Sequence, residues 1–485
     1  MRARKAVLVL PAILAVAAGF LIWERLKFDR AAWLADYEQL RTHASRNYAN
    51  LLWVIDERGL DPAALHRATL EELAAARTDR AARAAIASFI SAFQDAHFRI
   101  ARTPLSRSLE NLFTGQAEEM SANTSAEKAC AALGFRAEEE ELAFGLASTA
   151  PAENSFPSAT FQLGSRAAAI LRIPIFDQKR YRPACERAWR AHIGPRRCDR
   201  ACTETFVQTV VPNQLLSELT AQVRAFGQAG VALLVIDVTS NGGGTDWVEP
   251  AARIIANKQL ACAYVSFIKG PHWLKTFSAI VEKIDRDLRA SQNSGDVALL
   301  QVARRRAQDL ADRASASCAL DTLWIQGQRP ACSNLVDDAG YTACGLMGPL
   351  PKGSLARATA ADALFHGLGY DYAESVFAGR VAVLIDRHTA SAAEYFAAIL
   401  ADNDAAVLVG ERSFGLGCGY TGGGAGVLLT QSGLKVDMPD CQRLRRDGTN
   451  EMAGIAPRIA AGWQDGDDDD VRWSKVTAAL ASLAE

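Results

Sequence analysis

The chain has 485 residues, of which nearly half are hydrophobic, and a formal net charge of −2. This length is enough to bury a large core and predicts two or three domains. The balanced charge lacks the basic excess that is typical of nucleic-acid-binding proteins, so no nucleic-acid partner is expected.

The N-terminus has the pattern of a targeting segment. A basic flank at residues 1–5 precedes an uncharged run at residues 6–23, and charged residues follow it. Such a run is near the lower limit for a membrane-spanning helix, and no clear cleavage site lies at its end. The sequence therefore predicts an inner-membrane anchor within residues 1–28, with a cleaved signal segment as the alternative. Either way, the rest of the chain is expected in the periplasm or outside the cell.

Ten cysteines also fit an oxidising compartment. Cys198 and Cys202 are closely spaced, but no second such pair completes a zinc knuckle, so disulfides are favoured over metal. Cys418 and Cys441 flank a predicted β-hairpin at residues 426–438 and are the best candidates for one bridge.

The first half of the chain has two regions of different character. Residues 29–100 carry apolar side chains at helical spacing, which predicts a helical N-terminal region ending in the segment of His97. A single histidine is more often structural than catalytic, so His97 carries little weight by itself. Residues 101–163 show no convincing pattern and are interpreted as a linker or a small module.

Residues 164–463 alternate apolar strands with amphipathic helices, which predicts an α/β domain. A helical, cysteine-bearing insertion is expected at about residues 265–378, and a C-terminal helical tail at residues 464–485. Asn213 is a candidate N-cap for the first helix of the domain. The predicted strands are residues 166–176, 231–238, 381–385 and 405–409, and the predicted helices are residues 214–226, 247–257 and the segment from Ser391 onward.

Three consecutive glycines follow the predicted strand at residues 231–238. Gly242, Gly243 and Gly244 allow another backbone or a ligand to approach closely, and ligands bind at this edge of open α/β sheets. The pattern is not that of a phosphate-binding loop. The glycines are therefore interpreted either as a tight turn or as amide donors for an oxyanion.

Ser391 stands between a predicted strand and a predicted helix. The free N–H groups of a helix N-terminus can stabilise an anion beside a hydroxyl nucleophile. Serine is also among the preferred N-caps. The local pattern fits both roles equally well.

Three separated motifs together resemble the tail-specific (C-terminal processing) and tricorn-core serine peptidases. They are VIDVTSNGGG at residues 235–244, VLIDRHTASAAE at 383–394 continuing to VGERSFGLG at 409–417, and EMAGIAP at 451–457. The resemblance implies a crotonase- or ClpP-like α/β domain that cleaves polypeptides without a metal or organic cofactor. It favours Ser391 as the nucleophile.

One departure from the family pattern bears on the mechanism. The bacterial processing branch has the motif Phe-Gly-Lys-Gly, and its lysine corresponds to Leu416 here. Leucine cannot accept a proton, so a Ser–Lys dyad at these positions is excluded. The tricorn-like branch instead uses a histidine in an Asp-x-His segment, which matches residues 95–97, and a glutamate that matches Glu451. Ala96 stands where relatives can carry a supporting serine.

The resemblance implies a triad of Ser391, His97 as general base and Glu451 as the group that orients the imidazole. It implies an oxyanion hole formed by the N–H groups of Ala392 and of Gly242 or Gly243. His388, three residues before Ser391, is a rival base with an awkward approach.

The sequence thus predicts an exported serine endopeptidase that acts through an acyl-enzyme. The alternative is a catalytically inactive family member that binds peptides or apolar ligands, since fold does not dictate function. The missing lysine supports this alternative, whereas the retained serine, histidine and glutamate oppose it.

Overall fold

The structure is a computed structural model that describes residues 28–101, 119–136, 141–151, 154–336, 341–421 and 426–484. No helix within these residues is both long and apolar enough to cross a membrane. The predicted anchor at residues 6–23 lies outside the described residues.

A mixed six-stranded sheet forms the centre of the main domain, in the order β12-β8-β7-β4-β3-β2. Its strands are β2 (Ser158–Leu163), β3 (Arg166–Arg172), β4 (Leu233–Asp237), β7 (Arg380–Ile385), β8 (Val407–Gly410) and β12 (Ile459–Ala460). β2 pairs with β3 antiparallel, and the other neighbouring strands are parallel. The parallel strands β4 and β7 are nearly continuous apolar runs because helices cover the sheet on both faces. The four predicted strands are confirmed as β3, β4, β7 and β8.

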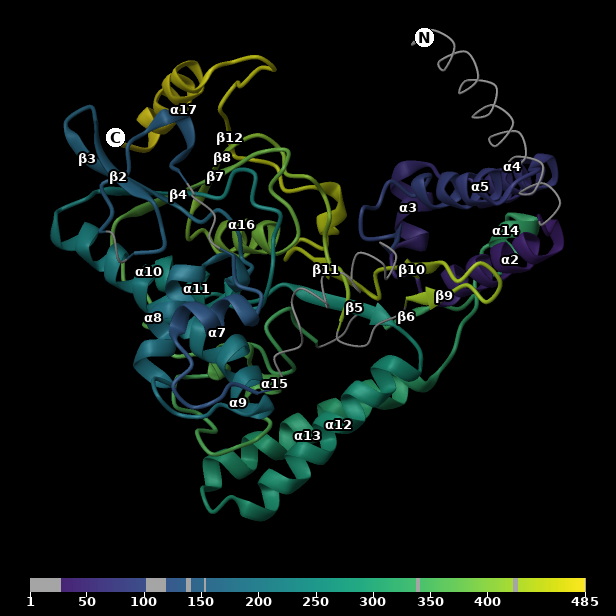
Figure 1. The fold of residues 1–485 in the computed structure, drawn as a ribbon, viewed down its shortest axis with the longest axis horizontal. Helices are drawn as coiled ribbons and strands as arrows, with labels where there is room; N and C mark the ends of the chain where they lie inside the picture. Colours follow the sequence, from purple (N-terminus) through teal and green to yellow (C-terminus); the bar gives the residue numbers. More distant parts are fainter. Residues whose placement is uncertain are drawn as a thin grey trace, which may run out of the picture.

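Helices cover the two faces of this sheet (Figure 1). Alternate residues of one strand face opposite layers, as Val235 and Ile236 do in β4. One face packs against α10 (Val211–Gln228), α11 (Val248–Ile255) and α16 (Ala392–Asp402), and the other against η1 (Ala143–Gly145) and α17 (Asp469–Ala484). The layers form the predicted α/β domain and leave the turns after β4 and β7 at the carboxyl edge.

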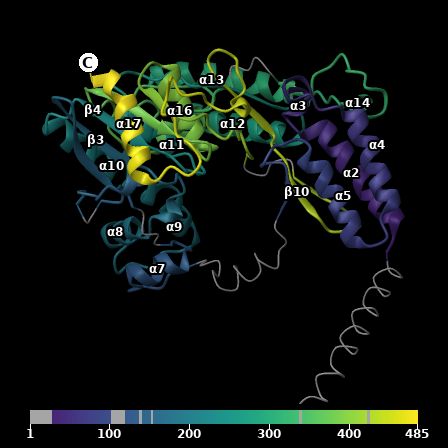
Figure 2. The same ribbon diagram turned by 90° about the horizontal axis from the view of Figure 1, so that it is seen from above.

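The N-terminal region is helical, as predicted, and has a core of its own. It comprises α2 (Arg30–Asn47), α3 (Leu51–Arg58), α4 (Pro62–Ala75) and α5 (Asp79–Ser91). These helices pack against α14 (Thr322–Gln326) and a small sheet of β1 (Arg99–Ile100), β10 (Lys435–Asp437) and β9 (Val427–Leu428). Figure 2 shows the helices beside β10 and away from β3 and β4. The β1–β10 pairing brings the segment of His97 to the main domain.

A third sheet and a helical hairpin form most of the insertion. The sheet has the order β11 (Cys441–Leu444), β5 (Tyr264–Ile268) and β6 (Leu335–Val336). The long helices α12 (Pro271–Ala290) and α13 (Ser294–Ser315) lie side by side, followed later by α15 (Ala361–Leu364) and η4 (His366–Gly369). The prediction of a helical insertion is confirmed for α12 and α13. The first residues of the predicted insertion instead belong to strand β5, because they pair with β11.

The other short helices surround a small cysteine-containing core. They are α7 (Ala126–Ala132), α8 (Arg182–His192), α9 (Arg200–Thr205) and the π-helix η3 (Phe206–Val210). Two further short helices are η2 (Gln178–Arg180), which precedes α8, and η5 (Glu451–Ala453), which follows β11. The predicted N-cap at Asn213 is wrong, because α10 continues directly from η3 and has Val210 in that position. The Asn213 side chain instead accepts the backbone N–H of Asp371.

Five disulfides pair all ten cysteines of the chain. The predicted bridge between Cys418 and Cys441 is confirmed. It joins the loop after β8 to β11, beside the candidate site. The other four are Cys130–Cys185, Cys198–Cys202, Cys262–Cys344 and Cys318–Cys332.

Candidate active site

The turn after β4 and the turn after β7 are bound to each other at the carboxyl edge of the sheet. The carboxylate of Asp386 accepts the backbone N–H groups of Ser240 and Thr389, each at 2.9 Å. The N–H of Ala390 donates to the carbonyl of Asn241 at 2.9 Å. These bonds fix the glycine turn relative to Ser391, although the two segments are far apart in the sequence.

Gly243 packs directly against Ser391. Its φ is +97°, and a Cβ at this position would lie 2.7 Å from Ser391 Cβ and 2.8 Å from Ala392 N. Asn241 Oδ1 accepts the Gly243 N–H at 2.8 Å, as asparagine side chains often do two residues along a turn. Of the two glycines predicted as oxyanion donors, Gly243 therefore has its N–H occupied. The exposed Gly242 has no hydrogen bond from its N–H to any described residue.

Ser391 is the N-cap of α16 and has an unusual backbone conformation. Its φ of 56° and ψ of −115° lie in a region that non-glycine residues rarely occupy. Such strain clusters at active sites, and a strained turn between strand and helix is how some hydrolases expose a serine nucleophile. The N–H of Ala392, in the first turn of α16, has no acceptor among the described residues. It points from a helix N-terminus, which suits it to an anion.

Glu394 holds the segment that contains Leu416 against the start of α16. This fully buried carboxylate accepts the N–H of Ser391 at 2.8 Å and the hydroxyl of Ser413 at 2.6 Å. It also accepts the N–H groups of Gly415 at 2.6 Å and Leu416 at 2.9 Å. Sequence reasoning assigned Glu394 no role, although its position three residues after an N-cap serine is that of a capping box.

His97 lines the same cavity as Ser391, and this cavity has a volume of about 470 Å³. Asp95 accepts the backbone N–H of His97 at 2.9 Å and the hydroxyl of Tyr48 at 2.9 Å. Asp95 therefore shapes the turn and does not bond the imidazole. Gly419 packs on the ring, since a Cβ there would lie 3.0 Å from His97 Cε1. Imidazole Nδ1 is buried without a hydrogen-bond partner among the described residues.

Burial lowers the pKa of His97 to about 4, and the positive charges of Arg443 and Arg99 act in the same direction. The imidazole is therefore neutral at neutral pH. A neutral imidazole is the form that can accept a proton from a serine hydroxyl.

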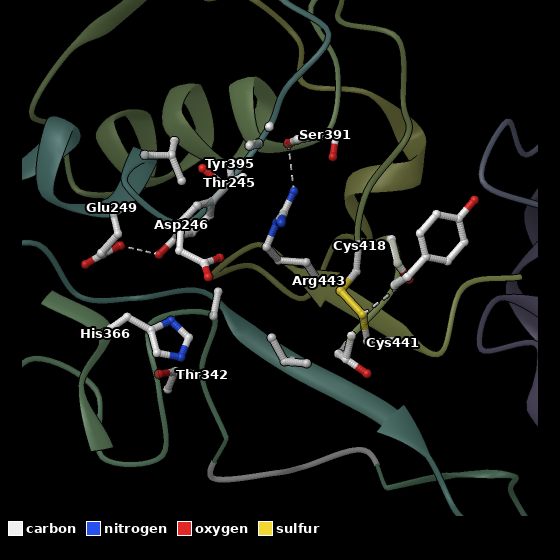
Figure 3. A pocket seen from close by; sticks show the side chains of 18 of the residues that line it. Thr245, Asp246, Glu249, Thr342, His366, Ser391, Tyr395, Cys418, Cys441 and Arg443 are labelled. Carbon is white, nitrogen blue, oxygen red and sulfur yellow. Dashed lines mark hydrogen bonds between the residues drawn. A yellow bond between two sulfur atoms is a disulfide. The ribbon is translucent and has the colours of Figure 1, made fainter. Parts of the chain in front are cut away.

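Arg443, on β11, connects Glu451 to Ser391. Its Nε donates to Glu451 Oε2 at 2.6 Å, and its Nη2 donates to the carbonyl of Ser391 at 2.9 Å (Figure 3). Burial raises the pKa of Glu451 to about 7, and Arg443 opposes this shift. Among the described residues, no hydrogen bond joins Glu451 to His97. Sequence reasoning missed Arg443, one of three arginines within four residues, because nothing in its pattern distinguishes it from Arg445 and Arg446.

His388, the rival base, lies elsewhere. It is exposed and lines a separate cavity of about 300 Å³ with Asp386, Arg387 and Asp465. It is not among the residues that line the cavity of Ser391.

Residues 208–461, more than half of the chain, match the sequence model of peptidase family S41. This chain belongs to peptidase family S41. It is therefore a serine-type peptidase by family, as the sequence motifs predicted. No curated protein sequence matches the chain significantly.

Several solved structures are similar to this chain. Mature CPAF complexed with lactacystin has a TM-score of 0.56 at 13% identity, and the match covers 94% of this chain and 97% of that one. Mature CPAF has a TM-score of 0.55 at 14% identity, with the same coverage. A peptidase from Parabacteroides merdae ATCC 43184 has a TM-score of 0.46 at 10% identity, covering 92% and 96% of the two chains. At these identities the CPAF structures show the fold alone, and this fold agrees with the predicted α/β domain.

One group of described residues in this S41 chain has the spacing of three metal ligands. It consists of Glu249, Cys262 and Cys344, all buried. The two cysteines are joined in a disulfide, and Glu249 is paired with Arg253 at 2.6 Å. The cluster therefore offers no free thiolate to a metal.

Proposed function

We propose that this S41 peptidase is an exported endopeptidase that cleaves peptide bonds through an acyl-enzyme on Ser391. The observation that carries the proposal is one shared cavity. It contains a serine in a strained turn at a helix N-terminus and a half-buried histidine held in its neutral form.

In the proposed reaction, His97 accepts the hydroxyl proton of Ser391 as Oγ attacks the substrate carbonyl carbon. The N–H groups of Ala392 and Gly242 donate to the oxyanion of the tetrahedral intermediate. The C–N bond then breaks, and the protonated imidazole gives its proton to the leaving amine. A water molecule, activated by the same imidazole, hydrolyses the ester and releases Ser391.

Glu451 has a less direct part in this proposal than the family resemblance implies. Its carboxylate bonds Arg443, which in turn bonds the carbonyl of Ser391. Glu451 Oε1 and His97 Nδ1 are both buried without partners among the described residues. We therefore assign Glu451 a positioning role through Arg443.

The five disulfides support an oxidising location for the enzyme. We propose that residues 6–23 anchor it in the inner membrane and that the peptidase domain faces the periplasm or the exterior. Its substrate is then an exported polypeptide.

Hydrolysis of an unfolded protein substrate by wild type and three variants tests the proposal. Ser391→Ala should reduce hydrolysis to background, and His97→Ala should reduce kcat by roughly 10²- to 10⁴-fold. His388→Ala is the matched control, because this histidine lines a different cavity, and it should cleave like wild type. Full activity in Ser391→Ala would overturn the proposal. Peptide binding without cleavage by wild type would support the inactive, peptide-binding alternative.

A further inference from the structure

The cavity of Ser391 extends past the catalytic groups to a second set of side chains. His97 and Tyr420 line it together with Ser391, and so do Asp246, Thr342 and His366. Figure 3 shows Asp246 between Ser391 and His366. When the carbonyl of a substrate lies at Ser391, the substrate side chain next to that carbonyl therefore lies in the rest of this cavity.

The charged groups of the cavity leave one carboxylate without a partner. Glu249 accepts hydrogen bonds from Arg253 at 2.6 Å and from the hydroxyl of Tyr395 at 2.5 Å. Arg443 is paired with Glu451 at 2.6 Å. Asp246 is exposed in the cavity, and its carboxylate has no ion pair or hydrogen bond with any described residue. The uncompensated charge in the cavity of Ser391 is therefore negative.

Aromatic side chains line the same cavity as this carboxylate. Burial raises the pKa of Tyr341 to about 12, and the charge of Asp246 contributes in the same direction. Burial, the charge of Asp246 and the charge of Asp362 raise the pKa of Tyr370. Tyr341 also packs edge-on against Trp273, and both line the cavity. An aromatic wall with a carboxylate suits an amphipathic cation, whose stem packs on the rings while its head meets the negative charge.

The backbone next to Asp246 is held in place by hydrogen bonds of Thr245. Asp246 follows the glycine turn that packs on Ser391, and its neighbour Thr245 is held on both sides. The Thr245 N–H donates to the carbonyl of Phe176 at 3.0 Å, and its hydroxyl donates to Gln178 Oε1 at 2.7 Å.

We propose that Asp246 makes this peptidase selective for substrates that carry a lysine or arginine side chain next to the scissile bond. The inference rests on the proposed function, because it assigns a specificity to the same site. In serine peptidases a single carboxylate in the specificity pocket is sufficient to select such side chains. Because Asp246 is open to solvent, the expected preference over an uncharged side chain of equal length is about two- to fivefold. The preference should fall as salt is added.

Matched quenched peptides that differ at one position, with lysine, arginine, norleucine or glutamate, test the proposal. The measurement is kcat/KM for each peptide, with the cleaved bond identified by mass spectrometry. Wild type should prefer the cationic peptides by about two- to fivefold, and Asp246→Asn should bring lysine and norleucine close to parity. Asp309→Asn, an exposed change on α13 away from the cavity, is the matched control and should retain the wild-type preference. An unchanged preference in Asp246→Asn, or no preference in wild type, would overturn the proposal.

Binding separates the failure of this inference from the failure of the proposed function. The lysine and norleucine peptides, carrying a fluorophore, are titrated by anisotropy against Ser391→Ala with and without Asp246→Asn. Tighter binding of the lysine peptide that depends on Asp246 supports the inference even if wild type cleaves nothing. Equal binding of the two peptides overturns it, whereas cleavage by wild type that is lost in Ser391→Ala leaves the proposed function standing.

Discussion

Replacing Gly243 with alanine should damage both the stability and the activity of the enzyme, because this glycine is where two turns meet. The new Cβ would lie 2.7 Å from Ser391 Cβ and 2.8 Å from the carbonyl oxygen of Ala390 and the nitrogen of Ala392. Two of these three atoms belong to the backbone, so the turns must separate. Overpacking of this kind costs about 1–3 kcal/mol. The φ of +97° adds roughly 1–2 kcal/mol for a residue with a side chain.

The expected loss in the free energy of unfolding for Gly243→Ala is therefore about 2–5 kcal/mol, measured by denaturant unfolding. A displacement of Ser391 by about 1 Å should also lower kcat by roughly 10²-fold. Gly227→Ala is the matched control, since it lies in α10 with no atom within 4 Å of an added Cβ. It should stabilise the protein by about 0.5–1 kcal/mol and leave kcat unchanged. Wild-type stability and kcat in Gly243→Ala would refute the close packing of the two turns.

Three further predictions concern the surroundings of the nucleophile. Because burial lowers the pKa of His97 to about 4, kcat/KM should fall in acid only near that pH, and an acid limb near 6.5 would contradict the assignment. The fold raises the pKa of Glu451 from 4.5 to about 7, so wild type loses stability as pH rises through this window. The side chain in Glu451→Gln does not titrate. The free energy of unfolding of wild type, relative to that of Glu451→Gln, should therefore fall by up to about 3 kcal/mol between pH 4.5 and pH 7. An equal difference at the two pH values would contradict the raised pKa. Changing both Cys418 and Cys441 to serine removes a disulfide with a sequence separation of 23. The free energy of unfolding should fall by about 3 kcal/mol, which is detected as a lower Tm. An unchanged Tm would contradict a stabilising role of this disulfide.

Much of the main domain could be predicted from the sequence because its strands are buried on both faces. Such strands appear as unbroken apolar runs, and β4 and β7 are of this kind. The helix that begins after Ser391 has an apolar face and a serine N-cap, which are local signals. The prediction of an N-cap at Asn213 is wrong because a π-helix joins α9 to α10 without a break. No helix begins at this residue, so no cap is needed there.

The placement of His97 in the cavity of Ser391 has no local signal. It depends on the pairing of Arg99 with Asp437, and a strand of two residues has no periodicity to detect. The prediction of His97 as the base came from the motif match alone. The expected boundary at residue 163 likewise separates β2 from β3, which pair in one sheet, because residues 101–163 carry few regular features.

Arg443 and Glu394 show a second limit of prediction. Both act through hydrogen bonds between segments far apart in the chain, Arg443 to Glu451 and Ser391, and Glu394 to Gly415. The sequence displays the charges but not their partners. For the same reason, the sequence does not reveal that the N–H of Gly243 is hydrogen-bonded whereas the N–H of Gly242 is free to donate to an oxyanion.

The most direct test of the account is the reaction of the enzyme with a fluorophosphonate, followed by mapping of the modified residue. We expect a single adduct on Ser391 in wild type. In His97→Ala, the rate of labelling should be slower by roughly 10²- to 10⁴-fold at pH 7. An adduct on another serine, or labelling of His97→Ala at the wild-type rate, would contradict the assignment of Ser391 as nucleophile and His97 as its base.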